Sequence, residues 1–304
     1  MGSVLKKLSI LFTACRGYSL PISLMSWLVP FLFALMSGGS LFSGLIALFG
    51  IIVLHMGVNI FDDAIDYTLA KKRIEKGEQE DFNFQQGKCI YIFNKELSLK
   101  QYYIISISLF LMGLLIGLFF LTVVGLKLLY IIIPTAILCL LYPILGCLGL
   151  GEVIVATIFS PLLYCGVYFV MTGKYSYEIL ILSISTGFLV VSVLHNHMLM
   201  DYKLDEKSRK ITLCRLCKSE KNALRLLGII IILAYINILF WILLGNLDIC
   251  YLISFLSLPF AIKLYKDMGN PKIEFLEKFL LPEKLLSIFT LLLCISIVVE
   301  KCIL

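Results

Sequence analysis

The residues FSGLIALFGIIVLHMGVNIFDDAID, at positions 42–66, carry a long apolar run directly into a cluster of polar side chains. The apolar part is long enough to cross a bilayer as a helix, which takes about 20 residues. Its end brings in three carboxylates, an amide and a histidine, and a charged group in hydrocarbon costs several kcal/mol. The stretch therefore predicts a membrane helix whose polar end has either an interfacial position or a function.

Apolar segments of similar length recur along the chain, which has 304 residues, is 60% hydrophobic and only 15% charged. A soluble domain carries more charge than this. The runs are continuous rather than alternating, which favours helices over barrel strands. We expect an all-α polytopic membrane protein, a nine-helix bundle forming a single membrane-embedded domain over residues 1–304. The nine spans are predicted at 19–36, 42–66, 102–123, 127–143, 152–171, 178–202, 224–245, 249–265 and 284–300.

The basic residues are distributed asymmetrically over the loops between these spans. The net charge is +6, and of the 26 Lys and Arg only Lys127, Lys174 and Lys301 fall on the second side. By the positive-inside rule, the N-terminus is cytoplasmic. The basic surplus thus indicates topology, with some attraction to anionic headgroups or substrates, and not a nucleic-acid partner.

Three hydrophilic segments lie on the predicted cytoplasmic side, at about 67–100, 201–223 and 266–283. The first two are expected to be active-site loops, because each follows an acidic cluster. Pro271 and Pro282 mark the third as a loop. Cys214 and Cys217 form one C-x-x-C in the second segment, but a zinc site usually needs a second ligand pair, and none lies nearby in the sequence.

The first acidic cluster lies on one face of a helix. Each residue of an α-helix turns by about 100°. The spacing i, i+3, i+4, i+7 therefore places Asn59, Asp62, Asp63 and Asp66 together, with His55 one turn earlier.

The second acidic cluster follows the sixth span. Asp201 and Asp205 are four residues apart on one helical face, and His197 lies one turn before them. The sequence therefore contains two oxygen-rich stripes, each at the predicted cytoplasmic end of a span.

Clustered carboxylates repel one another, which raises their pKa values unless a cation or donors neutralise them. Carboxylate and amide oxygens suit a hard ion such as Mg²⁺, which bridges a few carboxylates to phosphate oxygens. Ordinary interfacial residues would explain one such cluster, but two clusters at helical spacing favour a metal–diphosphate site. Neighbouring cations that could hold the same phosphates are Lys71, Lys72, Arg73, Lys203, Lys207, Arg209 and Lys210.

The two clusters resemble the Asp-rich motifs of the UbiA superfamily of intramembrane prenyltransferases. NIFDDAIDY, at 59–67, is similar to the N-x-x-(N/D)-D-x-x-D motif of the 1,4-dihydroxy-2-naphthoate, or menaquinone-type, branch. DYKLDEKSRKITL, at 201–213, resembles D-x-x-x-D followed by G-K-x-T-L. GLGEVIVATIFSPLLYCGVYFVMTG, at 149–173, resembles a third stretch of the same branch.

This resemblance implies Mg²⁺-dependent transfer of a polyprenyl group from its diphosphate to an aromatic acceptor, with 1,4-dihydroxy-2-naphthoate of menaquinone biosynthesis as the first candidate. It also implies an integral protein of the bacterial cell membrane with its active site facing the cytoplasm. The metal ligands implied are Asn59, Asp62, Asp63, Asp66, Asp201 and Asp205, of which Asp63, Asp66, Asp201 and Asp205 are the catalytic candidates. The expected diphosphate-binding residues are Asn59, Arg73, Lys207 and Lys210.

Three further residues are candidates for contact with the acceptor, namely His55, Glu152 and His197. Glu152 can also be interpreted as a charge favoured by the N-terminus of a helix, and either histidine as a partner in a helix–helix hydrogen bond. The motifs depart from the branch pattern at Ala64, at Arg209 in place of Gly, and at the His195–His197 segment. These departures leave the identity of the acceptor open, and the alternatives are a different aromatic compound or a lipid.

Two other protein classes also use carboxylates in membranes. CDP-alcohol phosphotransferases need a D-G-x-x-A-R segment, which this chain lacks. In an ion-coupled transporter, we would expect broken helices and acidic residues near the bilayer midplane. The acids here lie at span ends on one side, which favours the transferase.

Overall fold

The computed structural model describes residues 2–77, 89–207 and 211–303. Over these residues the chain forms helices and no strand, apart from one isolated bridge between Leu148 and Ile211. Nine segments of the described chain are helical, long and apolar enough to cross a membrane. The predicted all-α class with nine spans is therefore confirmed.

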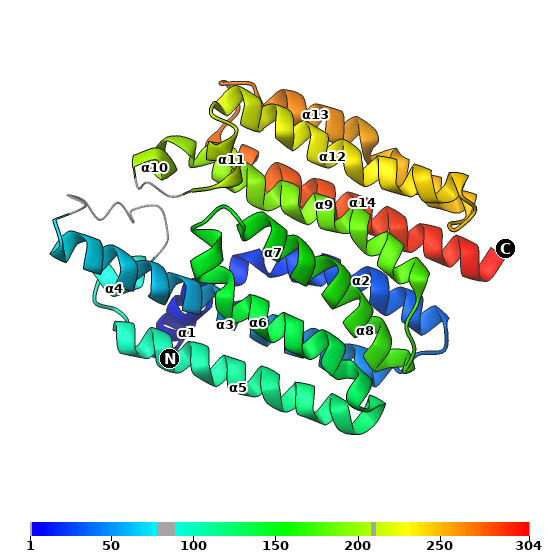
Figure 1. Ribbon diagram of the computed structural model, residues 1–304, viewed down its shortest axis with the longest axis horizontal. Coiled ribbons are helices and arrows are strands. Elements are labelled where there is room, and N and C mark those ends of the chain that lie inside the picture. The colour runs from blue at the N-terminus through cyan, green and yellow to red at the C-terminus, as the bar shows by residue number, and fades with distance from the viewer. Residues whose placement is uncertain (1, 78–88, 208–210, 304) are drawn as a thin grey trace.

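Long helices make up most of the molecule (Figure 1). The membrane-spanning elements are α2 (Leu20–Met36), α3 (Leu41–Glu75), α5 (Leu99–Val124), α6 (Leu129–Gly146), α7 (Gly151–Thr157), the π-helical η3 (Ile158–Leu162), α8 (Leu163–Thr172), α9 (Tyr177–Met200), α12 (Glu220–Leu243), η4 (Ile249–Ser257), α13 (Leu258–Met268) and α14 (Phe275–Ile303). Shorter elements are α1 (Gly2–Ala14), η1 (Gly17–Ser19), α4 (Ile90–Phe93), η2 (Leu126–Leu128), α10 (Tyr202–Lys207) and α11 (Leu213–Leu216).

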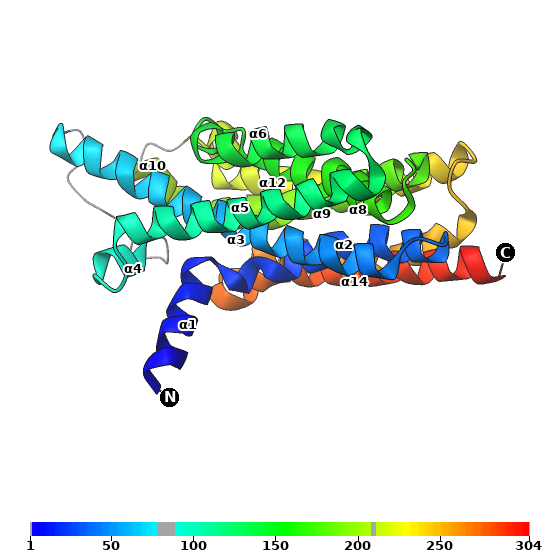
Figure 2. The ribbon, with the colours of Figure 1, turned by 90° about the horizontal axis from the view of Figure 1, so that it is seen from below.

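The long helices run roughly along one axis, and the short elements α1, α4, α10 and α11 gather at one end of the bundle (Figures 1 and 2). The C-terminus lies at the opposite end. Helix α3 packs against α5, while α9 packs against both α12 and α14, and α14 also contacts α2. The main core is built from buried apolar side chains of α2, α8, α9, α12 and α14.

Two helices differ from their predicted bounds. Helix α3 continues past the predicted end at residue 66 to Glu75, so Arg73 lies on the helix and not in a loop. Basic residues favour the last turn of a helix, where they face the negative end of its dipole, and Lys71 pairs with Glu75 at 3.8 Å.

Helix α14 begins at Phe275 and runs through Pro282. The prediction of a loop up to residue 283 was therefore wrong. Proline is tolerated inside membrane helices because neighbouring helices and polar side chains satisfy the freed backbone groups.

The fifth span contains one π-helical stretch, Ile158–Leu162, with Pro161 inside it. Proline lacks the N–H that an α-helix needs. The Ser160 hydroxyl donates a hydrogen bond to the backbone carbonyl of Ser183 on α9, which ties the irregular turn to the core. Such turns occur frequently at functional sites. Here the turn presents Phe159 to the cavity described below.

Candidate active site

A cavity of about 1430 Å³ extends through the bundle between α3, α5, α6, α8, α9 and the N-terminal part of α14. Its polar end is lined by charged side chains, and its remaining walls are mostly aliphatic and aromatic. Phe120, Leu128 and Val170 lie among the residues that line the apolar part. The volume exceeds the range of about 300–1,000 Å³ that is usual for small-molecule sites. The cavity thus suits a ligand with a charged head and a long hydrocarbon body.

The first acidic cluster lies in the C-terminal half of α3. Asn59 and Asp66 line the cavity. The Asn59 side chain donates hydrogen bonds to the Cys15 carbonyl and the Ser19 hydroxyl, both at 3.3 Å. These bonds fix the amide against the segment that joins α1 to α2.

Asp62 and Asp63 are buried and contact Arg16. The guanidinium donates to Asp62 Oδ2 at 3.2 Å and also to Asp63 Oδ1. Arg16 lines the cavity, whereas Asp62 and Asp63 are not among its lining residues. Asp62 and Asp63 therefore contact Arg16 and do not line the cavity, and their role as metal ligands stays a prediction.

Arg16 lies at the junction of α1 and η1 in the left-handed backbone region, with φ of 52°. Burial acts to lower the pKa of the guanidinium, but the charges of Asp63 and Asp62 outweigh it, so the pKa is raised and the side chain stays cationic. The sequence indicated Arg16 only as a topology charge. Its position just before the first span, where it interrupts an apolar stretch, was the available signal for a role in the site.

The second acidic cluster lies where α9 ends. Asp201 caps the C-terminus of α9, and Asp205 lies in α10. The Asp205 amide donates to the Asp201 carbonyl at 2.8 Å, so the helical spacing continues through the junction. Both residues line the cavity. Arg215 donates to the Asp205 carbonyl at 3.2 Å, which links α10 to α11.

The structure therefore brings Asn59, Asp66 and Arg73 of α3 into one cavity with Asp201 and Asp205. The Lys207 side chain and Lys210 lie outside what the structure describes, so their diphosphate contacts stay predictions. Among the described residues, no three Asp, Glu, His or Cys side chains converge tightly enough to form a metal cage. The arrangement suits a cation that takes only one or two carboxylates and completes its shell with water and ligand oxygens.

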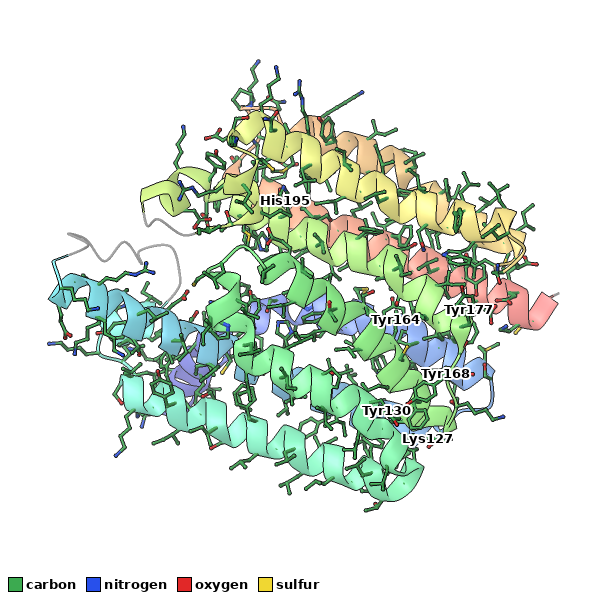
Figure 3. All side chains as sticks on the ribbon, viewed as in Figure 1. Lys127, Tyr130, Tyr164, Tyr168, Tyr177 and His195 are labelled. Atoms are coloured by element: carbon green, nitrogen blue, oxygen red, sulfur yellow. The ribbon has the colours of Figure 1, made fainter. Side chains whose placement is uncertain are left out.

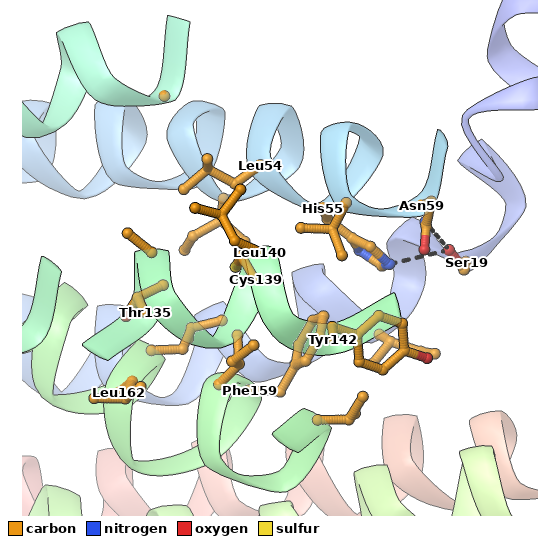
Figure 4. A pocket seen from close by; sticks show the side chains of 18 of the residues that line it. Ser19, Leu54, His55, Asn59, Thr135, Cys139, Leu140, Tyr142, Phe159 and Leu162 are labelled. Atoms are coloured by element: carbon orange, nitrogen blue, oxygen red, sulfur yellow. Dashed lines mark hydrogen bonds between the residues drawn. The ribbon is translucent and has the colours of Figure 1, made fainter. Parts of the chain in front are cut away.

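His55 lines the cavity deeper along α3 (Figure 4). Its Nδ1 lies 2.6 Å from the Ser23 hydroxyl, and its Nε2 lies 3.2 Å from the Ser19 hydroxyl. The ring also packs edge-on against Phe159, with the two centroids 5.2 Å apart. These contacts hold the imidazole in one orientation at the cavity wall.

His197 lines the cavity from α9 and stacks on Phe279 of α14, with ring centroids 3.9 Å apart and an interplanar angle of 5°. Phe279 and Glu283 also line the cavity. The sequence analysis missed both, because they lie in the segment predicted to be a loop and form no motif. Tyr142, which is labelled in Figure 4, also lines the cavity. The sequence analysis missed it because it belongs to no motif.

Glu152 does not line the cavity. It lies in the first turn of α7, is only 2% exposed, and its Oε1 is 3.8 Å from Nδ1 of the fully buried His195. Figure 3 shows His195 on α9, away from the labelled tyrosines. Cys214 approaches the same Nδ1 at 3.4 Å. The predicted contact between Glu152 and an acceptor therefore has no support in the cavity lining.

Several solved structures are similar to this chain in fold. A structure reported for digeranylgeranylglyceryl phosphate synthase in membranes is 18% identical, with a TM-score of 0.64 and coverage of 98% of this chain and 100% of that chain. A UbiA homolog from Archaeoglobus fulgidus, bound to GPP and Mg²⁺, is 13% identical, with a TM-score of 0.64 and coverage of 94% and 99%. A UbiA homolog from Aeropyrum pernix K1 in its apo form is 14% identical, with a TM-score of 0.63 and coverage of 92% and 98%.

At sequence identities this low, the similarity to these structures concerns the fold alone. No curated protein matches the chain in sequence. The sequence model of the UbiA prenyltransferase family matches residues 23–272, which include both acidic clusters and most of the chain. The chain therefore belongs to the UbiA prenyltransferase family.

Proposed function

We propose that this protein transfers a polyprenyl group from its diphosphate to an aromatic acceptor, with 1,4-dihydroxy-2-naphthoate as the first candidate, in a reaction that depends on Mg²⁺. The observation that carries the proposal is the shape of the cavity, whose acidic and basic end leads into a long apolar body. A polyprenyl diphosphate has the matching shape, with a charged head on a hydrocarbon chain. Membership of a prenyltransferase family supports the same reaction class.

The residues at the polar end fit Mg²⁺. Asn59, Asp66, Asp201 and Asp205 offer only oxygen ligands to the cavity, which a hard cation prefers. When bound, the ion supplies neutralisation of the charge that develops on the leaving diphosphate. The homolog from Archaeoglobus fulgidus was solved with GPP and Mg²⁺ together, which supports this choice of cation.

Cationic side chains of the chain itself would hold the diphosphate. Arg73 and Arg16 line the cavity, and Lys207 and Lys210 follow the second acidic cluster. Asp62 and Asp63 orient Arg16 through their ion pairs. In this arrangement Asp63 acts by positioning a cation, and Asp66, Asp201 and Asp205 face the substrate.

The apolar walls have a chemical role as well. Ionisation of an allylic diphosphate produces a carbocation, which water would quench. Side chains such as Phe159 and Leu162 keep that part of the cavity dry. An electron-rich ring carbon of the acceptor then attacks the cation, and loss of a proton or of CO₂ restores the aromatic ring.

The same residues suggest an orientation. The basic residues cluster at the end of the bundle that carries the acidic clusters, so we place this end in the cytoplasm of a bacterial cell, with residues 1–304 acting as one domain. A lipid acceptor is the second candidate, because one similar structure is that of a digeranylgeranylglyceryl phosphate synthase.

The test uses the purified full chain in lipid nanodiscs. It receives a prenyl diphosphate and 1,4-dihydroxy-2-naphthoate, with Mg²⁺ or with EDTA, and pyrophosphate and prenylated product are quantified together. We expect both products only with Mg²⁺, and losses of at least a hundredfold in Asp66→Ala and Asp201→Ala. Glu75→Ala is the matched control, since Glu75 is an exposed carboxylate on α3. The absence of pyrophosphate with every donor and acceptor would exclude the proposal.

A further inference from the structure

One wall of the cavity is formed by α9 and α14, and two polar groups on it, one ring nitrogen of His197 and the Glu283 carboxylate, have no partner in the described part of the chain. His197, Phe279 and Glu283 line this wall. The Nε2 atom of His197 is buried without a hydrogen-bond partner. The Glu283 carboxylate forms no hydrogen bond or ion pair with any described residue. Buried polar atoms are normally paired, so the unpartnered Nε2 of His197, beside the half-buried Glu283 carboxylate on the same cavity wall, indicates a ligand.

The depth of this wall follows from the helical rise of about 1.5 Å per residue. His197 lies one turn from Asp201 into the bundle, and Phe279 stacks directly on it. Glu283 lies one turn further along α14, away from the acidic end. On α3, His55 lies about 10 Å from Asp62 in the same direction. Glu283 and His55 therefore both lie deeper in the bundle than the acidic residues proposed to hold the diphosphate.

Neither part of the prenyl donor accounts for Glu283. The diphosphate is an anion and would be repelled by a carboxylate, which carries the same charge. The prenyl chain has no polar hydrogen, so it would leave the carboxylate partly desolvated and unpaired, which is costly. Of the two proposed substrates, the acceptor is the one whose polar hydrogens can pair with this carboxylate. A ring hydroxyl can donate a hydrogen bond to Glu283, whereas a carboxylate of the acceptor would be repelled.

We infer that His197, Phe279 and Glu283 form the acceptor-binding wall, and that Glu283 accepts a hydrogen bond from a ring hydroxyl of the acceptor. The inference rests on the proposed function. The flat His197–Phe279 stack forms the adjoining aromatic surface. The acceptor carboxylate, where one is present, points away from α14, toward the Arg16 side of the cavity. The family match ends at residue 272, so it assigns no role to these α14 residues.

The test measures acceptor and donor kinetics separately. The substrates are a prenyl diphosphate of fixed length with either 1,4-dihydroxy-2-naphthoate or its monomethyl ethers, each of which masks one hydroxyl. The wild type should prefer the free hydroxyl at one ring position by at least tenfold. In Glu283→Leu the acceptor KM should rise at least tenfold and this preference should disappear, while the KM for the prenyl diphosphate stays within twofold. Glu283→Gln keeps an oxygen acceptor without the charge and should fall between the two.

Glu277→Leu is the matched control, because Glu277 is an exposed carboxylate on the same helix. Transfer by the wild type together with an unchanged acceptor KM in Glu283→Leu would overturn the inference and leave the proposed function intact. If Glu283→Leu fails to fold, the wild type alone decides: equal use of free and methylated acceptors overturns the inference. No transfer by the wild type to any acceptor would overturn both.

Discussion

Removal of the Arg16 cation tests how the first acidic cluster is held together. In Arg16→Met the side chain keeps much of its length but loses the charge that faces two buried carboxylates. Asp62 and Asp63 are 5% and 2% exposed, and Arg16 contacts both. Removing one partner of a buried ion pair costs about 3–5 kcal/mol. The Arg16 side chain is 17% exposed, so the lower end of this range is expected.

A loss of about 3 kcal/mol is a large share of the 5–15 kcal/mol that typically separates folded from unfolded protein. The apparent melting temperature in detergent, followed by size-exclusion chromatography after heating, should fall by several degrees. Adding Asp62→Asn and Asp63→Asn to Arg16→Met should restore most of the loss, because neutral groups no longer need the cation.

Arg225→Met is the control, since Arg225 is exposed and its side chain bonds, among the residues that the structure describes, only to Asn222 on its own helix. The reasoning fails if Arg16→Met melts within one degree of Arg225→Met. It also fails if the triple variant is less stable than Arg16→Met, because the carboxylates would then not be the groups that Arg16 compensates.

Three further outcomes follow from other parts of the structure. Burial, together with the nearby Glu152 charge, raises the pKa of the Cys214 thiol, so the unreactive protonated form prevails at pH 8. Iodoacetamide should therefore label the exposed Cys302 and leave Cys214 unmodified in the folded protein, which peptide mass spectrometry can check. Gly187→Ala should destabilise the protein by about 1–3 kcal/mol in thermal unfolding, because the new Cβ would lie 2.7 Å from the Ser160 Cβ. Ala47→Phe, which places a ring in the apolar part of the cavity, should reduce kcat/KM for long prenyl diphosphates much more than for geranyl diphosphate, and equal losses for both would count against a tail site there.

Local patterns were sufficient to predict the helices and the two clusters. Apolar runs of membrane length gave the nine spans, and helical spacing placed Asp201 and Asp205 on one face, as the structure bears out. These features depend on residues that are close in sequence. The spacing of the first cluster was also informative, since Asn59 and Asp66 do line the cavity.

Long-range packing determined the remaining features of the site. Spacing alone could not reveal that Arg16 lies against Asp62 and Asp63, because that contact depends on where the segment before α2 folds back. Phe279 and Glu283 reach the cavity only because α14 packs beside α2 and α9. No local signal distinguishes Glu283 from an ordinary interfacial charge.

The length of α3 has a consequence for how a substrate arrives. Its 35 residues extend about 52 Å, well beyond the hydrocarbon thickness of about 30 Å. Counted from Leu41, about 20 residues cross that thickness, which brings the boundary close to the first acidic cluster. By its length, α3 places the first acidic cluster near the boundary of the hydrocarbon layer, which is the depth of the lipid phosphates. For the proposed prenyl diphosphate, a site at this depth would let the charged head stay at the level of the lipid phosphates, so binding would not require its transfer into hydrocarbon.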